Sequence, residues 1–325
     1  MKLLLTAIGK RIELITHLKT AFTVIGTDCS ELNPAKNFVD SFYLVPRYTD
    51  PDYAEALLAI VKKEQVDLLV PLYELEFPLL CTLREKLLEE GCRLVLSGAD
   101  VIRICNGKAE TAAFFEECHI PAPKTYQPQE ILQLREEEIS YPLIVKPRNG
   151  MGSEGVFRVK NRNELEFFTA YVPGAIVQEC ARGEEYTIDV LCDFEGHPIY
   201  IVPRIRLEVR SGEVVKSRTV RQQKVIDETA SLLDALNQKG TVIGPMTVQC
   251  FYEEETDTVS FIEINPRFGG GVPLSFAAGA DYASAMRAMA TGEEIPYREE
   301  GFRIMTMMRY DQSVFESVGD GNEIM

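Results

Sequence analysis

The sequence predicts an α/β protein with α+β elements in its later part, and three observations support this. Apolar strands alternate with amphipathic helices up to about residue 105, which is typical of βαβ units and a parallel sheet. A hairpin is predicted over residues 246–265. At 325 residues, with 46% hydrophobic and 26% charged residues, the chain has the size and composition of two or three globular units.

The first unit should contain five strands separated by helices. The predicted strands are Lys2–Ile8, Phe22–Asp28, Phe42–Val45, Asp67–Pro71 and Arg93–Leu96. Helices are predicted between them, notably over Tyr53–Glu64 and Leu79–Glu90. A nicotinamide-binding domain is disfavoured, because the first turn, residues 6–11, has one glycine where the pyrophosphate fingerprint needs three. Asp28, at the position of a ribose-binding acid, is therefore expected in a loop.

A helix over Gly107–Cys118 should open the second unit. Asn106 is predicted to be its N-cap, and its apolar face is predicted to be Ala112, Phe115 and Cys118. Lys108 lies in the first turn, where the helix dipole disfavours a cation by up to about 1 kcal/mol. This placement indicates an anionic ligand, although a solvated surface lysine is the simpler explanation if Lys108 is taken alone.

A strand containing Lys146 is followed by a glycine-rich loop, residues 149–155. Successive backbone N–H groups in such a loop can converge on a phosphate, and a preceding lysine adds a charge. A plain glycine-rich hairpin is an equally good interpretation. After the strand Ala175–Cys180, exposed backbone and a following acid could bind an adenine edge and ribose, or the chain could simply turn at Arg182 and Gly183.

Residues 204–224 form a basic segment in an acidic chain. Arg206 and Lys224 are the candidate catalytic residues in this segment, which also holds Arg204, Arg210, Lys216, Arg218 and Arg221. Arg204 and Arg206 share one strand face, so an anion site for phosphate or a carboxylate substrate is one interpretation. A sheet edge protected by cations is the other. The later predicted elements are a helix over Val225–Lys239, a helix over Asp281–Ala290 and a strand over Arg303–Tyr310.

The predicted hairpin, Met246–Glu253 and Thr258–Asn265, gathers oxygen-bearing side chains. If it folds about Thr256, Gln249 lies across from Glu263, and Glu263 and Asn265 project to the same face. Arg267 follows two residues later. Hard oxygen donors beside a fixed positive charge suit Mg²⁺ that bridges phosphate oxygens. The alternative is a polar surface hairpin. It is less favoured, because a merely solvated strand would rarely end in Glu-x-Asn-Pro-Arg followed by three glycines.

Charge and composition exclude several function classes. A net charge of −16 argues against nucleic-acid binding. Three histidines and eight cysteines without metal-ligand spacing give little support to a zinc site or a Ser-His-Asp hydrolase. The cysteines are interpreted as reduced thiols of a cytoplasmic protein. No apolar run approaches the ~20 residues that cross a bilayer, so no membrane contact is expected.

Taken in order, these segments resemble the ATP-grasp superfamily over nearly the whole chain. The fourteen-residue spacing from Gln249 to Glu263, followed by Asn265-Pro-Arg267, is most similar to one synthetase half of the carbamoyl-phosphate synthetase large subunit. The resemblance implies a Rossmann-like pre-ATP-grasp domain (1–105), a lid subdomain (106–182) and a C-terminal subdomain with the metal and phosphate site (183–325). Lys108 and Lys146 depart from the arginines that the synthetase halves usually carry.

The resemblance also implies roles for individual residues. Lys108 and Lys146 would contact ATP phosphates, Arg267 would stabilise the transferring phosphoryl group, and Glu263 with Gln249 and Asn265 would hold Mg²⁺ or Mn²⁺. The remaining nucleotide contacts would come from the phosphate lid (Gly150, Gly152, Ser153, Gly155), the adenine hinge (Gln178, Glu179, Cys180, Ala181) and the ribose acid Glu185.

The implied reaction is ADP-forming ligation, in which a carboxylate, bicarbonate or carbamate becomes an acyl phosphate that an amine or ammonia attacks. A chain with one synthetase half is expected to be a stand-alone carboxylate–amine ligase. The alternatives are a subunit of a split carbamoyl-phosphate synthetase and a non-catalytic nucleotide-binding partner. A homodimer or a partner subunit remains open.

Overall fold

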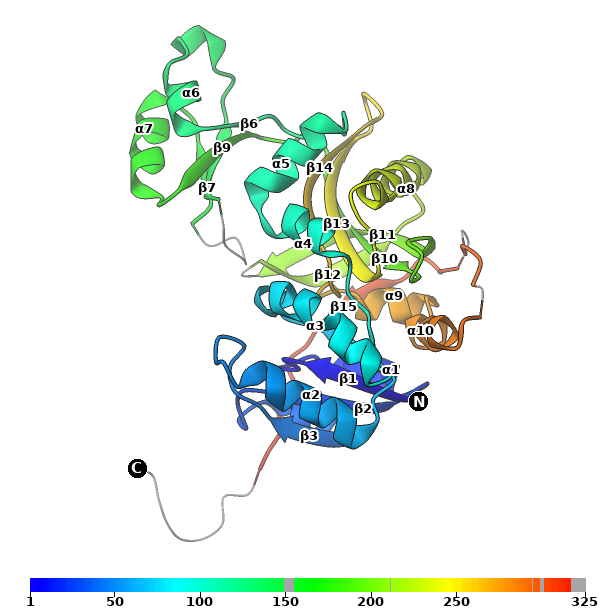
Figure 1. Cartoon of the computed structure of the whole chain (residues 1–325). Coiled ribbons are helices and arrows are strands. Elements are labelled where there is room, and N and C mark those ends of the chain that lie inside the picture. The colour runs from blue at the N-terminus through cyan, green and yellow to red at the C-terminus, as the bar shows by residue number, and fades with distance from the viewer. Residues whose placement is uncertain (149–154, 211, 294, 299–300, 317–325) are drawn as a thin grey trace.

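The computed structural model describes residues 1–148, 155–210, 212–293, 295–298 and 301–316, which form three sheets with their helices. In Figure 1 the first sheet lies below a larger antiparallel sheet, and a smaller lid unit projects from the far end of the larger one. Gly150, Gly152 and Ser153 of the predicted phosphate loop lie outside the described residues.

The N-terminal sheet is parallel, as predicted, with the order β3-β2-β1-β4-β5. Its strands are β1 (Lys2–Thr6), β2 (Thr23–Asp28), β3 (Ser41–Leu44), β4 (Leu68–Pro71) and β5 (Arg93–Leu94), with helices α1 (Ile12–Leu18), α2 (Tyr53–Glu64) and α3 (Phe77–Glu89). Leu3 and Leu5 pack into one core and Leu4 into another, because alternate residues of a strand face opposite sides. The sheet is therefore buried on both faces.

Asp28 is not in a loop as predicted. It ends β2, and its carboxylate accepts hydrogen bonds from the backbone N–H groups of Gly9 (3.0 Å) and Ser30 (3.1 Å). It therefore fixes the turn after β1.

Two helices, α4 (Ala99–Asn106) and α5 (Lys108–Glu117), connect the first unit to the rest. The prediction that Asn106 caps the second helix is wrong, because Asn106 ends α4 and the extended residue Gly107 is the N-cap of α5. The predicted apolar face is also partly wrong, since the buried residues of α5 are Thr111, Phe114 and Phe115. Both phenylalanines pack into the core of the large sheet.

The lid unit has an antiparallel sheet of its own, in the order β6-β9-β7-β8. It comprises β6 (Thr125–Tyr126), β7 (Leu143–Pro147), β8 (Phe157–Val159) and β9 (Ala175–Glu179), with helices α6 (Pro128–Leu132) and α7 (Arg162–Tyr171). Its buried residues, among them Leu143, Val145 and Leu165, form a separate cluster.

The large sheet is antiparallel, in the order β14-β13-β10-β11-β12-β15. Its strands are β10 (Glu184–Cys192), β11 (Pro198–Arg210), β12 (Glu213–Thr219), β13 (Gly244–Glu253), β14 (Thr258–Asn265) and β15 (Thr306–Met308). Helix α8 (Gln223–Asn237) covers one face with Ile226, Thr229, Leu233 and Leu236 buried, as predicted.

The opposite face packs on the N-terminal unit. Helices α9 (Pro273–Ala278) and α10 (Tyr282–Thr291) lie between the N-terminal unit and the large sheet (Figure 1). They share one core with β1 and α1, in which Leu5, Tyr200 and Tyr282 are buried. The first and last units are therefore joined by apolar packing, whereas the core of the lid is separate from theirs. Among the helices that the structure describes, none is both long and apolar enough to cross a bilayer.

Candidate active site

The β13–β14 hairpin has the predicted register where the candidate metal ligands lie. Gln249 pairs with Glu263 and Thr247 with Asn265, which confirms the pairing expected for a turn at Thr256. A bulge after Gln249 shifts the outer half of the hairpin by one residue. Glu263 and Asn265, two residues apart on one strand, lie on the same face.

These three side chains are available to a ligand. In the described part of the chain, Gln249, Glu263 and Asn265 make no side-chain hydrogen bond or ion pair to another residue. Nowhere among the residues that the structure describes do three or more His, Cys, Asp or Glu side chains form a group that could hold a metal ion. The donor set is therefore one carboxylate and two amides, which fits a Mg²⁺ ion whose other ligands are phosphate oxygens.

Lys146 on β7 lies near this face. Its ammonium group donates to Oε1 of Gln178, 2.7 Å away. Burial and the nearby charge of Lys108 lower the pKa of Lys146 to about 8, although Glu263 acts in the opposite direction. The structure therefore brings together two predicted phosphate lysines and the predicted metal carboxylate from three separate segments.

The predicted adenine hinge is anchored by hydrogen bonds. The Nε2 atom of Gln178 donates to Oγ1 of Thr125 (3.0 Å), and the Tyr126 hydroxyl donates to the Glu179 carboxylate (2.9 Å). The backbone N–H of Glu179 donates to the carbonyl of Lys124 (3.0 Å). Cys180 and Ala181 follow β9 directly, outside regular structure. Gly155, the one residue of the four in the predicted phosphate lid that the structure describes, has a φ of +70°.

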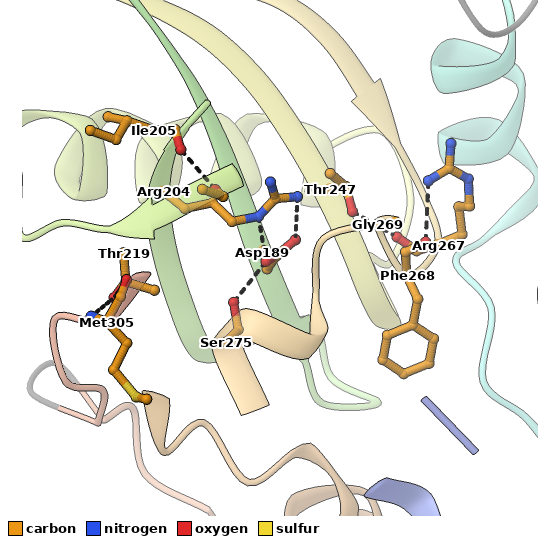
Figure 2. Close-up of polar contacts among 12 residues, drawn as sticks. Asp189, Arg204, Ile205, Thr219, Thr247, Arg267, Phe268, Gly269, Ser275 and Met305 are labelled. Atoms are coloured by element: carbon orange, nitrogen blue, oxygen red, sulfur yellow. Dashed lines mark hydrogen bonds and ion pairs between the residues drawn. The ribbon is translucent and has the colours of Figure 1, made fainter. Parts of the chain in front are cut away.

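Arg267 contacts the N-terminal unit. Its Nε lies 2.6 Å from Oε1 of Glu74, and its Nη1 donates to the carbonyl of Phe268 at 3.1 Å. The hydroxyl of Thr247 donates to the Arg267 carbonyl at 3.0 Å, and this contact holds the loop against β13 (Figure 2). Glu74 could not be identified from the sequence, because it lies in a short 3₁₀ turn (Glu74–Glu76) of another unit.

A buried ion pair supports the glycine loop that follows. Asp189 accepts from Nε of Arg204 at 2.9 Å and from the hydroxyl of Ser275 at 2.7 Å, as Figure 2 shows. Both charged side chains are almost fully buried, at 1% and 3% exposure. A Cβ on Gly271 would lie 2.7 Å from the guanidinium carbon of Arg204, so this side chain packs directly on the loop. A lone acid in the apolar run of β10 is the signal that could have identified Asp189.

The two catalytic candidates of the basic segment lie in different surroundings. Arg206 Nη1 is 2.6 Å from the carboxylate of Glu185, the predicted ribose acid. Lys224 pairs with Glu228 at 2.8 Å on α8, and the carboxylate of Asp257 in the hairpin turn is among the charges that raise its pKa. Arg206 thus contacts the predicted ribose acid and Lys224 faces the hairpin turn, and the catalytic roles of both stay predictions.

Family models match two parts of the chain. Residues 105–271, just over half of the chain, match the ATP-grasp domain. Residues 3–95 match the PylC-like N-terminal domain. The first match includes Lys108, Lys146, Glu263, Asn265 and Arg267.

Solved structures share the fold at low sequence identity. Biotin carboxylase from Campylobacter jejuni, in complex with β-γ-ATP, matches with a TM-score of 0.72 and 16% identity, over 93% of this chain and 73% of that one. N5-carboxyaminoimidazole synthetase from Staphylococcus aureus, in complex with ADP, matches with a TM-score of 0.72 and 17% identity, over 95% of this chain and 82% of that one. L-amino acid ligase from Bacillus licheniformis matches with a TM-score of 0.66 and 21% identity, over 91% of this chain and 77% of that one.

These neighbours establish the fold, and the family model establishes the membership. The predicted fold class, an N-terminal domain with a parallel sheet followed by an ATP-grasp fold, is confirmed. The predicted resemblance to one synthetase half of carbamoyl-phosphate synthetase is not specifically supported by the neighbours named above. The chain belongs to the ATP-grasp family.

Proposed function

We propose that this chain is an ADP-forming ligase that activates a carboxylate as an acyl phosphate for attack by an amine or ammonia. The observation that carries the proposal is the hairpin face on which Gln249 and Glu263 pair, with Asn265 beside them and Arg267 two residues later. Solved relatives with ADP, with MgADP and with β-γ-ATP support ATP and Mg²⁺ (or Mn²⁺) as the nucleotide and metal.

Each residue then has a defined task. Glu263, Gln249 and Asn265 hold the metal, and Lys108 and Lys146 neutralise the phosphate oxygens. Gln178, the backbone of Glu179, Cys180 and Ala181, and the carboxylate of Glu185 position the nucleoside. These tasks are positioning and charge neutralisation, which are the main requirements of phosphoryl transfer.

The reaction itself needs no protein nucleophile. An oxygen of the bound acid forms a bond to the γ-phosphorus while the bond from that phosphorus to the ADP oxygen breaks. Arg267 stabilises the charge on the transferring group. The amine nitrogen then attacks the acyl carbon, loses a proton and displaces inorganic phosphate. Arg206, through its contact with Glu185, orients the ribose side of the site.

A finer candidate is carbamoyl-phosphate synthetase-like chemistry on bicarbonate or carbamate. The spacing from Gln249 to Glu263, followed by Asn265-Pro-Arg267, favours it. We favour a stand-alone carboxylate–amine ligase, because ligases such as L-amino acid ligase are among the solved structures with this fold. A subunit of a split synthetase is the alternative. Eight free thiols are consistent with the proposed cytoplasmic location.

The test is ADP release from MgATP over a panel of bicarbonate, amino acids and other carboxylates, each with and without ammonia or an amine. A substrate pair should raise ADP release at least about tenfold over ATP alone. Calorimetry of MgATP binding accompanies the screen. If the chain binds MgATP but none of the acids supports ADP release, it would be a non-catalytic nucleotide-binding partner. If it binds no nucleotide, the whole proposal would be contradicted.

A further inference from the structure

Three arginine side chains from distant segments meet at the glycine loop of residues 269–271. Arg11, in the turn before α1, donates through Nη1 to the carbonyl of Gly269 at 3.2 Å. Arg309, just after β15, donates to the carbonyl of Gly270. Arg267 lies two residues before Gly269, and its charge acts on Arg11. Arg11 and Arg309 lie outside the segment that matches the ATP-grasp domain.

The three guanidinium groups differ in how closely carboxylates pair with them. Arg267 pairs closely with Glu74 (2.6 Å), whereas Arg309 lies 3.5 Å from Glu13 and 3.7 Å from Glu213. Among the residues that the structure describes, no carboxylate oxygen lies within 4.0 Å of the Arg11 guanidinium. Burial, followed by the charge of Arg267, lowers the pKa of Arg11 to about 10. Arg309 acts in the same direction, whereas Glu213 and Glu74 act in the opposite one. Gathering like charges in a partly buried site costs free energy that a bound anion would offset.

The group is built on fixed elements and stays open to a ligand. The N–H of Gly9, two residues before Arg11, donates to the Asp28 carboxylate at 3.0 Å. A Cβ on Gly269 would lie 2.8 Å from Oγ1 of Thr247, so the loop backbone is pressed against β13. The side chains of Arg267 and Arg309 are 23% and 26% exposed. Arg267 and Arg309 are therefore held in place without being sealed from solvent.

From this arrangement we infer that Arg11 and Arg309 form a subsite for a second anionic group of the acid substrate, a carboxylate or a phosphate. The inference rests on the proposed function, in which Arg267 already serves the transferring phosphoryl group. Two further guanidiniums beside it exceed what a single reacting carboxylate requires, and guanidinium suits either oxyanion. Arg11 and Arg309 are then specificity-determining residues, supplied by the N-terminal unit and by the segment after β15.

The first test compares acids with matched neutral counterparts: glutamate with glutamine, and O-phosphoserine with serine. ADP release is measured for the wild type, Arg11→Gln, Arg11→Lys, Arg309→Gln and the control Arg103→Gln. Arg103 carries the same charge on an exposed face of α4, where it pairs with Asp100. The two pairs distinguish a second carboxylate from a phosphate.

We expect the wild type to prefer the acid with two anionic groups. Arg11→Gln and Arg309→Gln should raise the KM of that acid about tenfold or more, with the KM of ATP within about twofold of the wild type. Arg11→Lys should restore part of the affinity, and Arg103→Gln should behave as the wild type. Equal turnover of both members of each pair, or an unchanged preference in Arg11→Gln, would overturn the subsite.

A binding measurement separates this inference from the proposed function. Calorimetric titration with inorganic phosphate, without nucleotide, should detect binding to the wild type and to Arg103→Gln that weakens about tenfold in the double variant Arg11→Gln/Arg309→Gln. If no acid supports ADP release but phosphate binding depends on the two arginines, the subsite stands and the ligase proposal fails. If phosphate binding is unchanged in the double variant, the subsite is wrong whatever the turnover.

Discussion

Glu263 supplies the one carboxylate among the three candidate metal ligands, so the site should be most sensitive to its charge. Glu263→Gln keeps the size of the side chain but removes that charge. We expect kcat for ADP formation to fall by about 10²–10³-fold. The far-ultraviolet circular dichroism spectrum should be unchanged, because Glu263 makes no ion pair with a described residue.

The matched control for this change lies in the turn of the same hairpin. Glu255→Gln removes an equal charge from an exposed position and should leave ADP formation within about twofold of the wild type. If Glu255→Gln lowers kcat for ADP formation as much as Glu263→Gln does, the overall charge of the hairpin would be the cause. Wild-type turnover in Glu263→Gln would contradict the assignment of Glu263 as a metal ligand.

Lys146 should make nucleotide binding depend on pH. Its pKa is about 8, below the usual lysine value, so the free protein loses this charge above pH 8. A bound triphosphate stabilises the ammonium form, so binding must take up a proton in this range. Affinity for MgATP should therefore weaken as pH rises above 8, by at most about tenfold per unit for one proton.

Calorimetry in buffers of different ionisation enthalpy measures this uptake directly. At about pH 9 the wild type should take up close to one proton, and at about pH 7 far less. Lys146→Met should show no difference between the two conditions. Proton uptake that persists in Lys146→Met would assign the titration to another group.

Single residues differ in how far the sequence could place them. The Gln249–Glu263 pair could be predicted, because strand alternation and a short turn leave one register. The contact of Arg267 with Glu74 could not, because it depends on how two separately folded units pack. The same holds for Arg11, whose partner is a backbone carbonyl far along the chain.

At the scale of elements, the start of β10 depends on one glycine. Gly183 has a φ of +96°, and a Cβ there would lie 2.1 Å from the carbonyl oxygen of Tyr252 on β13. Gly183→Ala must therefore move the two strands apart near the hinge and Glu185. We expect a loss of about 2 kcal/mol or more in the free energy of unfolding, measured with urea.

Gly174 provides a control with the same backbone requirement but no crowding. Its φ is +60°, and a Cβ would meet no atom within 4 Å. Gly174→Ala should cost only about 1 kcal/mol, the ordinary penalty of the left-handed region. Equal losses in the two variants would mean that the approach of Tyr252 is not what makes Gly183 necessary.

Elements with a clear hydrophobic period were predicted closely, and those without one were not. Helix α2 has the predicted bounds, and α8 differs by two residues at each end, because their apolar residues recur at helical spacing. In α5 the apolar residues Ala112 to Phe115 are consecutive, so the sequence does not indicate which face is buried. The break at Gly107 was missed because Asn106 is as good an N-cap by type as Gly107.

For the whole molecule, the sequence indicated the units but not which of them pack together. A parallel sheet buried on both faces could be predicted, yet apolar strands do not specify their partner. In the structure one core joins β1 and α1 to α9 and α10, and the lid has a core of its own. This packing places Glu74 and Arg11 against the loop after β14, so the candidate site is complete only when the first and last units are joined.

A shared core predicts shared stability. Leu5 on β1 and Leu165 on α7 are both fully buried, the first in the joint core and the second in the lid. Either leucine-to-alanine change should lower the free energy of unfolding of the unit that contains it by about 2–5 kcal/mol. Hydrogen exchange followed by mass spectrometry should show that Leu5→Ala weakens protection in the N-terminal sheet and in α9 and α10 together, with the lid unchanged. Leu165→Ala should weaken protection in the lid alone. Loss confined to the N-terminal sheet in Leu5→Ala would show that the joint core is not one cooperative unit, and the residues that Arg11 and Glu74 bring to the site would then be held by polar contacts only.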